Sequence, residues 1–180
     1  TRVMRRMLPR MTRKRPPDDW ARENRVYPLS SGRPGPKDPA LTPYMIPFMR
    51  AFDDPSYNTV AFVCGGQMGK TDSIIDVVLS RLDQRPVPII YAGPDRNFVT
   101  DQFEPRFDDA LNRSKSLSVK LARGKKNKKT RKVVSGVPVR LAWAGSANQL
   151  KSDPAGLAIV DERDGMAKNI KGEGDPVRLL

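Results

Sequence analysis

A glycine-rich segment between an apolar run and a helical pattern is the feature that most constrains how this chain can fold. Residues 65–71 are Gly-Gly-Gln-Met-Gly-Lys-Thr, and the run before them, residues 58–64, has the continuous β-rich character of a strand buried on both faces. After residue 71, apolar residues recur at helical spacing until Arg85-Pro86, where the helix should stop. The sequence therefore predicts a strand, a tight turn and a helix in immediate succession.

This succession favours a phosphate-binding loop. The standard pattern is a glycine, four residues and then Gly-Lys-Ser/Thr, and here Cys64 stands at the first position, so the match is a variant. Lys70 would reach the β- and γ-phosphates of ATP, and Thr71 would offer its hydroxyl to Mg²⁺. The predicted nucleotide-binding residues are Gly65, Gly66, Gln67, Met68, Gly69, Lys70 and Thr71. The alternative is that the glycines only form a flexible turn.

A second apolar run, residues 157–160, leads directly into two carboxylates and supplies the other half of such a site. Asp161 is placed to ligate Mg²⁺, and Glu162, which projects differently, could polarise the water that attacks the γ-phosphate. Ligands of open α/β sheets bind at the carboxyl ends of the strands, where both motifs fall. We therefore assign catalytic roles to Glu162 and Lys70 and metal binding to Thr71 and Asp161. A helix N-cap or a solvated turn is the alternative for the acidic pair.

The remaining chain alternates strands with helices. Helical spacing is found at residues 41–52 and 98–111, and strands are expected at residues 87–92, 133–134 and 137–145. Pro105 requires a kink or a break, and Ser135-Gly136 favours a hairpin turn. This alternation predicts an α/β fold of the P-loop NTPase class (RecA-like, ASCE type), with a mainly parallel central sheet and helices on both faces.

Positive charge is concentrated in two segments. The chain has a net charge of +13, which favours a polyanionic partner, and residues 113–132 contain ten basic residues and no acid. We expect residues 1–39 to form a basic Pro/Arg-rich arm, extended or disordered unless a partner orders it, and residues 40–180 to form the ATPase domain. Residues 113–132 are either a DNA-gripping or subunit-bridging insertion or a solvated one.

No aromatic residue is interleaved with these cations, so contacts with DNA would go to the phosphate backbone independently of sequence. The tentative DNA-binding residues are Lys125, Lys126, Lys128, Lys129, Arg131 and Lys132.

Other classes of protein are disfavoured. No run of about 18 apolar residues is present, so we expect no membrane partner. A single cysteine, Cys64, and the absence of histidine exclude an internal disulfide and a credible zinc site, which fits a reducing, cytoplasmic setting. The acid-free start superficially resembles a transit peptide, but a basic tail suits a nucleic-acid partner equally well.

Together, these motifs resemble the ATPase domain of a tailed-bacteriophage terminase large subunit, in the branch typified by the phage lambda large subunit. The resemblance covers about residues 32–180. Besides the loop, its parts are Leu-Thr-Pro-Tyr at residues 41–44, Tyr-Ala-Gly-Pro-Asp at 91–95, Gly-Ser-Ala-Asn at 145–148, Asp-Glu-Arg-Asp at 161–164 and Gly-Glu-Gly-Asp-Pro at 172–176.

The resemblance implies an ATP-driven motor that uses Mg²⁺ and loads double-stranded DNA into a procapsid in the host cell cytoplasm. Implied partners are a small terminase subunit and the portal, and a homo-oligomeric ring is expected on assembly. By the same analogy Tyr44 lies in the segment that contacts adenine, although an aromatic at a helix start can also be a staple into the core. No nuclease domain is expected within these residues.

Position 66 departs from the family pattern. Many large terminase subunits carry an arginine directly before the Gln67 position, and here that residue is Gly66. The arginine that neutralises transition-state charge must then come from elsewhere, such as Arg163, Arg96 or a neighbouring subunit. Two other functions stay open: a helicase or remodelling DNA-dependent ATPase, and a non-catalytic nucleic-acid-binding module with a degenerate loop.

Overall fold

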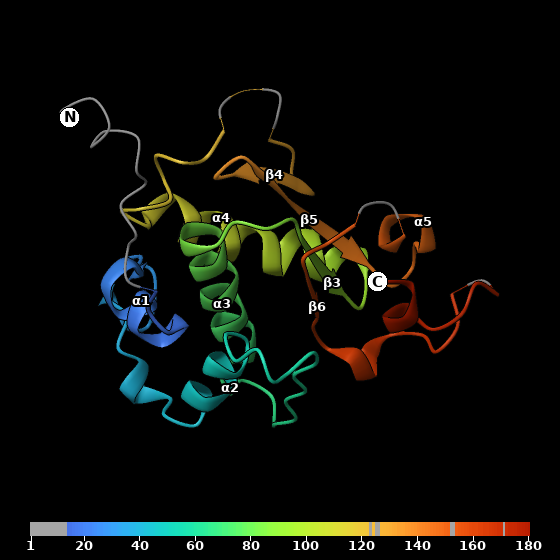
Figure 1. The fold of residues 1–180 in the computed structure, drawn as a ribbon, viewed down its shortest axis with the longest axis horizontal. Helices are drawn as coiled ribbons and strands as arrows, with labels where there is room; N and C mark the ends of the chain where they lie inside the picture. The colour runs from blue at the N-terminus through green and yellow to red at the C-terminus, as the bar shows by residue number, and fades with distance from the viewer. Residues whose placement is uncertain (1–13, 123, 125–126, 152–153, 171) are drawn as a thin grey trace, which may run out of the picture.

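Three parallel strands and one antiparallel strand form the central sheet. The computed structural model describes residues 14–122, 124, 127–151, 154–170 and 172–180. The strand order is β4-β5-β3-β6, in which β3 is parallel to β5 and β6, and β4 is antiparallel to β5. The strands are β3 (Ile89–Gly93), β4 (Arg131–Val134), β5 (Val137–Trp143) and β6 (Leu157–Val160) (Figure 1). The predicted mainly parallel sheet is confirmed.

The hairpin between β4 and β5 turns where the sequence predicted. Ser135 and Gly136 both have positive φ angles, 51° and 82°. Two successive residues of this kind give the turn a twist that matches paired strands, and glycine adopts the second conformation without steric cost.

The long helix α3 (Lys70–Gln84) also forms as predicted. It begins after Gly69, which has a left-handed φ of 85°, and ends at Gln84, directly before Arg85-Pro86. Its apolar residues pack into the main core, as the helical spacing required. Pro105 lies in the first turn of α4 (Glu104–Arg113), where proline is tolerated. The kink or break that was expected in the helical pattern of residues 98–111 takes the form of a π-helix, η3 (Phe98–Phe103), directly before α4.

Helices cover both faces of the sheet. On β3, Ile89 and Tyr91 point into a core shared with α3 and α4, whereas Ile90 and Ala92 point to the opposite face. That second face is covered by α5 (Ala147–Leu150) and by the C-terminal 3₁₀-helix η6 (Pro176–Leu179) (Figure 1). A ring stack of Tyr91 on Phe103, with centroids 3.5 Å apart, joins the sheet to η3.

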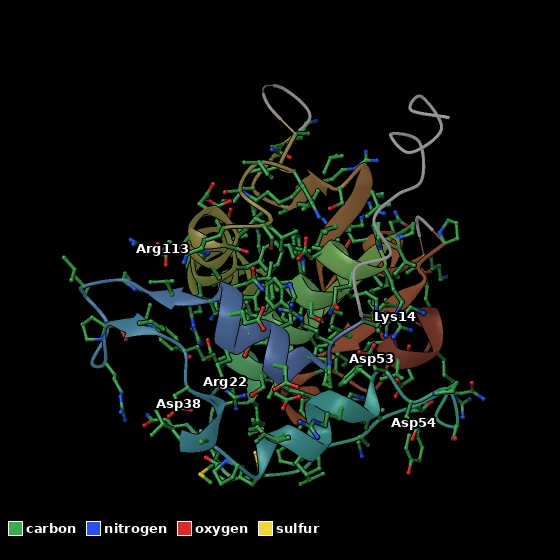
Figure 2. All side chains as sticks on the ribbon, turned by 60° about the vertical axis from the view of Figure 1, so that its left-hand side comes forward. Lys14, Arg22, Asp38, Asp53, Asp54 and Arg113 are labelled. Carbon is green, nitrogen blue, oxygen red and sulfur yellow. The ribbon has the colours of Figure 1, made fainter. Side chains whose placement is uncertain are left out.

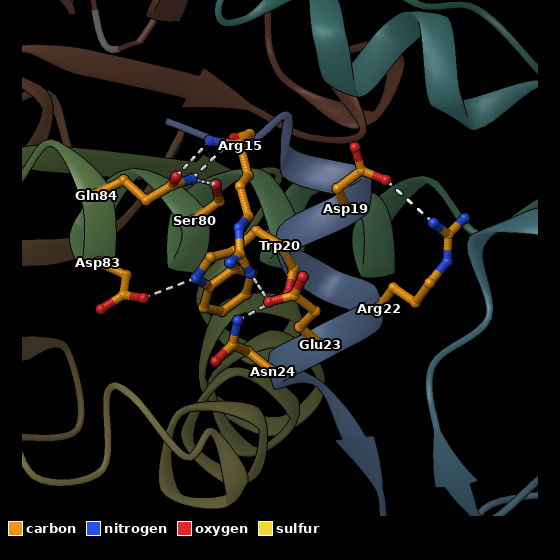
Figure 3. Close-up of polar contacts among 9 residues, drawn as sticks. All are labelled: Arg15, Asp19, Trp20, Arg22, Glu23, Asn24, Ser80, Asp83 and Gln84. Atoms are coloured by element: carbon orange, nitrogen blue, oxygen red, sulfur yellow. Dashed lines mark hydrogen bonds and ion pairs between the residues drawn. The ribbon is translucent and has the colours of Figure 1, made fainter. Parts of the chain in front are cut away.

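The segment expected to be an arm is folded against the domain. The helix α1 (Pro17–Asn24) packs beside α3, and its Trp20 is only 2% exposed (Figure 1). The Trp20 indole Nε1 donates to Asp83 Oδ2 at 2.8 Å (Figure 3). The prediction of an extended or disordered arm is therefore wrong for residues 17–39, because one buried tryptophan anchors a helix too polar to show an apolar period. Residues 1–13 lie outside the described residues.

Beyond α1, this segment is held by a buried ion cluster. It continues through β1 (Val26–Tyr27), β2 (Gly35–Pro36), the 3₁₀-helix η2 (Pro39–Leu41) and α2 (Met45–Ala51). Arg25 and Lys37 are buried, and both pair with Asp72 and Asp76 on α3. Burial raises the pKa of Asp76 to about 6, although both cations oppose the shift. Other charges of the segment, such as Arg22 and Asp38, lie at the surface (Figure 2).

The predicted strand at residues 58–64 is not formed. The structure gives no strand there, and Val63 is 97% exposed. Phe62 packs on Phe48, with ring centroids 4.8 Å apart. A continuous apolar run is compatible with a strand but does not supply the paired backbone that a strand requires, and this is why the prediction is wrong.

Candidate functional site

The glycine-rich segment approaches the first turn of α3 through two left-handed residues. Gln67 has a φ of 58° and Gly69 a φ of 85°. A side chain at position 69 would have space, since its nearest contact would be Thr42 at 3.9 Å, so the backbone conformation is what favours glycine there. The Tyr44 hydroxyl donates to the Met68 carbonyl oxygen at 3.2 Å and ties α2 to this loop.

Lys70 and Thr71 occupy the first turn of α3, where the helix has free N–H groups and a partial positive charge. Lys70 Nζ lies 3.5 Å from Glu162 Oε1 and 3.5 Å from the Cys64 carbonyl oxygen. Two residues predicted to act together, Lys70 and Glu162, are therefore neighbours in space.

Asp161 is buried at the end of β6 and receives two hydroxyl hydrogen bonds. Thr71 Oγ1 and the Tyr91 hydroxyl both donate to Asp161 Oδ2, each at 2.9 Å. Burial, followed by the negative charge of Asp161, raises the pKa of Tyr91, so its phenol stays protonated and keeps donating. No role was predicted for Tyr91, whose only signal in the sequence is its place in the Tyr-Ala-Gly-Pro-Asp motif at residues 91–95.

Glu162 has an unusual backbone for a residue other than glycine. Its φ and ψ are 53° and 49°, a left-handed conformation that costs about 1–3 kcal/mol. The side chain lines the same cleft as Lys70. Strain of this kind is often retained where a side chain must be aimed, and here it accompanies the carboxylate that faces Lys70.

The site lies in a cleft of about 390 Å³. Its lining residues are Gln67, Gly69, Lys70, Thr71, Phe98, Gln102, Phe103, Arg106 and Glu162. Gln102 and Arg106 were not anticipated, because helical spacing shows which residues of a helix are polar but not which of them face a cleft.

The other predicted residues are placed less centrally. Tyr44 contacts the loop but does not line the cleft, and it is 43% exposed rather than stapled into the core. Arg163 pairs with Asp175, and the Arg96 guanidinium lies 5.9 Å from the Trp143 ring centroid, so neither proposed source of an arginine reaches the cleft.

The basic insertion is only partly described. Lys125 and Lys126 lie outside the described residues, while Lys128, Lys129 and Arg131 are exposed. Lys132 is buried and pairs with Glu104 and Asp108, each at 2.8 Å. Its assignment as a DNA contact is corrected, because its charge is already neutralised inside the fold. Among the helices that the structure describes, none is long and apolar enough to cross a bilayer.

Fold and site define a mixed α/β protein in which a glycine-rich loop, a lysine, a threonine and two carboxylates meet at the end of a parallel strand. The family model for the phage terminase large subunit gpA, ATPase domain, matches residues 31–180. The chain belongs to this family, and the resemblance seen in its sequence is confirmed. Membership gives the chain an ATPase role in phage DNA packaging and favours it over a helicase or remodelling enzyme. No curated protein and no solved structure matches the chain.

Proposed function

We propose that this chain is a P-loop NTPase of the RecA-like type that binds ATP with Mg²⁺ in the cleft and hydrolyses it to drive double-stranded DNA into procapsids. The observation that carries the proposal is the Thr71–Asp161 hydrogen bond of 2.9 Å, which joins two motifs 90 residues apart. Terminase family membership supports the DNA-packaging setting, and we expect the protein to act in the host cytoplasm.

The loop side of the cleft is suited to the phosphates of ATP. Lys70 would exchange its 3.5 Å contact with Glu162 for the β- and γ-phosphate oxygens, and the N-terminus of α3 favours the same negative charge. Tyr44 lies next to the loop and is proposed to border the adenine.

The residues present fit Mg²⁺. Thr71 Oγ1 and Asp161 Oδ2 are hard oxygen donors 2.9 Å apart, and Mg²⁺ is usually held by one or two protein oxygens together with substrate phosphates. Consistent with so small a donor set, the described residues contain no group of three or more His, Cys, Asp or Glu placed to hold a metal. When bound, the ion would neutralise charge on the phosphates.

Glu162 is proposed to orient the attacking water and to accept its proton. The water oxygen bonds to the γ-phosphorus, and the bond to the β–γ bridging oxygen breaks with its electron pair passing to ADP. The products are ADP and inorganic phosphate. In the structure, the Lys70 ammonium faces the Glu162 carboxylate. When Lys70 turns to the phosphates of ATP, Glu162 loses this partner and becomes free to accept the proton.

The proposed partners follow the family. They are double-stranded DNA, the small terminase subunit, the portal of the procapsid and further copies of the chain in a ring. Lys128, Lys129 and Arg131 are exposed and are proposed, with Lys125 and Lys126, to contact DNA phosphates.

ATP binding and Mg²⁺-dependent hydrolysis by the parent and by Glu162→Gln test the proposal. We expect Glu162→Gln to bind ATP while turnover falls at least 100-fold, since general-base catalysis contributes about 10²–10⁴-fold. Glu23→Gln, at an exposed position on α1, is the matched control and should match the parent. A parent that does not bind ATP would refute the proposal and favour a non-catalytic nucleic-acid-binding module.

A further inference from the structure

The cleft contains a second cation that the loop does not supply. Residues 65–69 carry no charged side chain, so Lys70 is the only cation on the loop side. Arg106 of α4 lines the same cleft as Lys70. We propose that Arg106 contacts the γ-phosphate of ATP bound to its own subunit and stabilises the charge that develops as the phosphoryl group is transferred. This inference rests on the proposed function.

The position of Arg106 is set by a rigid support. The preceding Phe103 and the following Phe107 are buried, and their rings are 5.8 Å apart between centroids. Phe103 also stacks on Tyr91, whose hydroxyl binds Asp161. The helix that presents Arg106 is thereby packed on the residues that hold the proposed metal ligand.

The Arg106 guanidinium is available for a ligand. It is exposed, and within the described residues it makes no hydrogen bond or ion pair. The acids that flank it are already used, because Lys132 pairs with Glu104 and Asp108, and Arg113 pairs with Asp109. Arg106 therefore has no carboxylate partner among the described residues, and its side chain lines the cleft. A free guanidinium in this position suits an anionic ligand.

Arginine also suits the chemistry. Its planar guanidinium can donate two parallel hydrogen bonds to phosphate oxygens, which a lysine ammonium cannot match in geometry. Charge in phosphoryl transfer is spread over the equatorial γ-phosphate oxygens, and an arginine placed there contributes about 10³–10⁵-fold to turnover.

Arg106→Ala and Arg106→Lys test the role, with Arg113→Ala at the end of the same helix as the matched control (Figure 2). For Arg106→Ala we expect turnover to fall about 10³-fold, while ATP affinity changes less than about tenfold. Binding of ADP with aluminium fluoride, which mimics the transferring phosphoryl group, should weaken far more than binding of ADP. Arg106→Lys should recover little, and Arg113→Ala should match the parent.

The outcomes separate this inference from the proposed function. If the parent binds no ATP, the proposed function fails. If the parent binds ATP and Arg106→Ala keeps the parent's affinity for ADP–aluminium fluoride, Arg106 is not the stabilising residue. An unchanged melting temperature of Arg106→Ala is expected, since Arg106 has no protein partner to lose among the described residues.

A mixing experiment tests whether Arg106 acts within its own subunit. Arg106→Ala protein is combined with Lys70→Ala protein, which retains Arg106 but lacks the phosphate-binding lysine. If Arg106 serves its own cleft, every cleft in the mixture is defective and turnover stays at the level of the separate variants. Recovery of turnover on mixing would show that Arg106 reaches a neighbouring subunit and would overturn the assignment.

Discussion

Thr71 Oγ1 donates a hydrogen bond of 2.9 Å to Asp161 Oδ2, and this bond connects the start of α3 with the end of β6. The same carboxylate oxygen also accepts from Tyr91 on the neighbouring strand β3. The proposed metal ligand therefore receives two hydrogen bonds, one from the first turn of α3 and one from a residue of the sheet. The orientation depends on packing in the sheet as much as on the glycine-rich loop.

Tyr91→Phe should raise the Mg²⁺ concentration needed for half-maximal ATP hydrolysis. The substitution removes the hydroxyl that orients Asp161 but keeps the ring stacked on Phe103. The free energy of unfolding should fall by only about 1 kcal/mol, the usual value of one hydrogen bond. Titration of Mg²⁺ in an ATPase assay measures the effect, and Tyr57→Phe, at a position 58% exposed, is the control. An unchanged Mg²⁺ requirement would show that Thr71 alone orients Asp161.

Lys37→Met should lower the free energy of unfolding by about 3 kcal/mol, because it removes one partner of the buried Asp76 carboxylate. Breaking a buried ion pair usually costs about 3–5 kcal/mol, and we expect the lower value because Arg25 still pairs with Asp76. Chemical denaturation measures the loss. Arg22→Ala, which removes an exposed pair with Asp19, should cost less than about 0.5 kcal/mol. A loss below about 1 kcal/mol for Lys37→Met would contradict the role given to the cluster.

The pH dependence of Lys37→Met follows from Asp76. The Asp76 pKa is already raised to about 6 in the folded protein, and removing Lys37 takes away a charge that lowers it. Because the folded pKa exceeds the unfolded value of about 4, folding favours the protonated carboxyl, and stability is lost as the pH rises through the folded pKa. The stability deficit of the variant should therefore be smaller near about pH 4.5 than near about pH 7.5. A deficit that is equal at both values would argue against this assignment.

Trp20→Ala should lower the free energy of unfolding by about 3–5 kcal/mol, because a large buried side chain is replaced by a cavity. Leu29→Ala, at a residue of the same segment that is 92% exposed, should stay within about 0.5 kcal/mol of the parent. Urea unfolding of both variants distinguishes a folded N-terminal segment from a loose arm. Equal free energies of unfolding for the two variants would support the prediction of an extended or disordered arm.

Neutralising Lys125, Lys126, Lys128 and Lys129 together should flatten the salt dependence of DNA binding, by roughly one unit of slope for each DNA phosphate that is no longer neutralised. Lys132→Ala should leave the slope unchanged and lower stability instead, because Lys132 pairs with Glu104 and Asp108. Binding to duplex DNA at several salt concentrations gives the slopes. If Lys132→Ala by itself reduced the salt dependence of DNA binding, Lys132 would contact DNA and its role would not be limited to the buried pairs with Glu104 and Asp108.

The sequence by itself determined the elements whose signals are local. Helix α3 repeats its apolar residues every three or four positions, and the hairpin of β4 and β5 has Ser135-Gly136 at the turn, so neighbouring residues were enough to predict both. The motif residues Lys70, Thr71, Asp161 and Glu162 were identified in the same way, together with the family.

Only the tertiary structure decided features that depend on residues far apart in the chain. Trp20 forms its hydrogen bond with Asp83, Arg25 and Lys37 meet the carboxylates of α3, and residues 58–64 have no ladder partner. The left-handed backbone of Glu162 and the place of Arg106 in the cleft likewise have no local signal. Periodicity reports which side of an element is apolar, whereas the partner of a polar side chain is set by the packing of the whole domain.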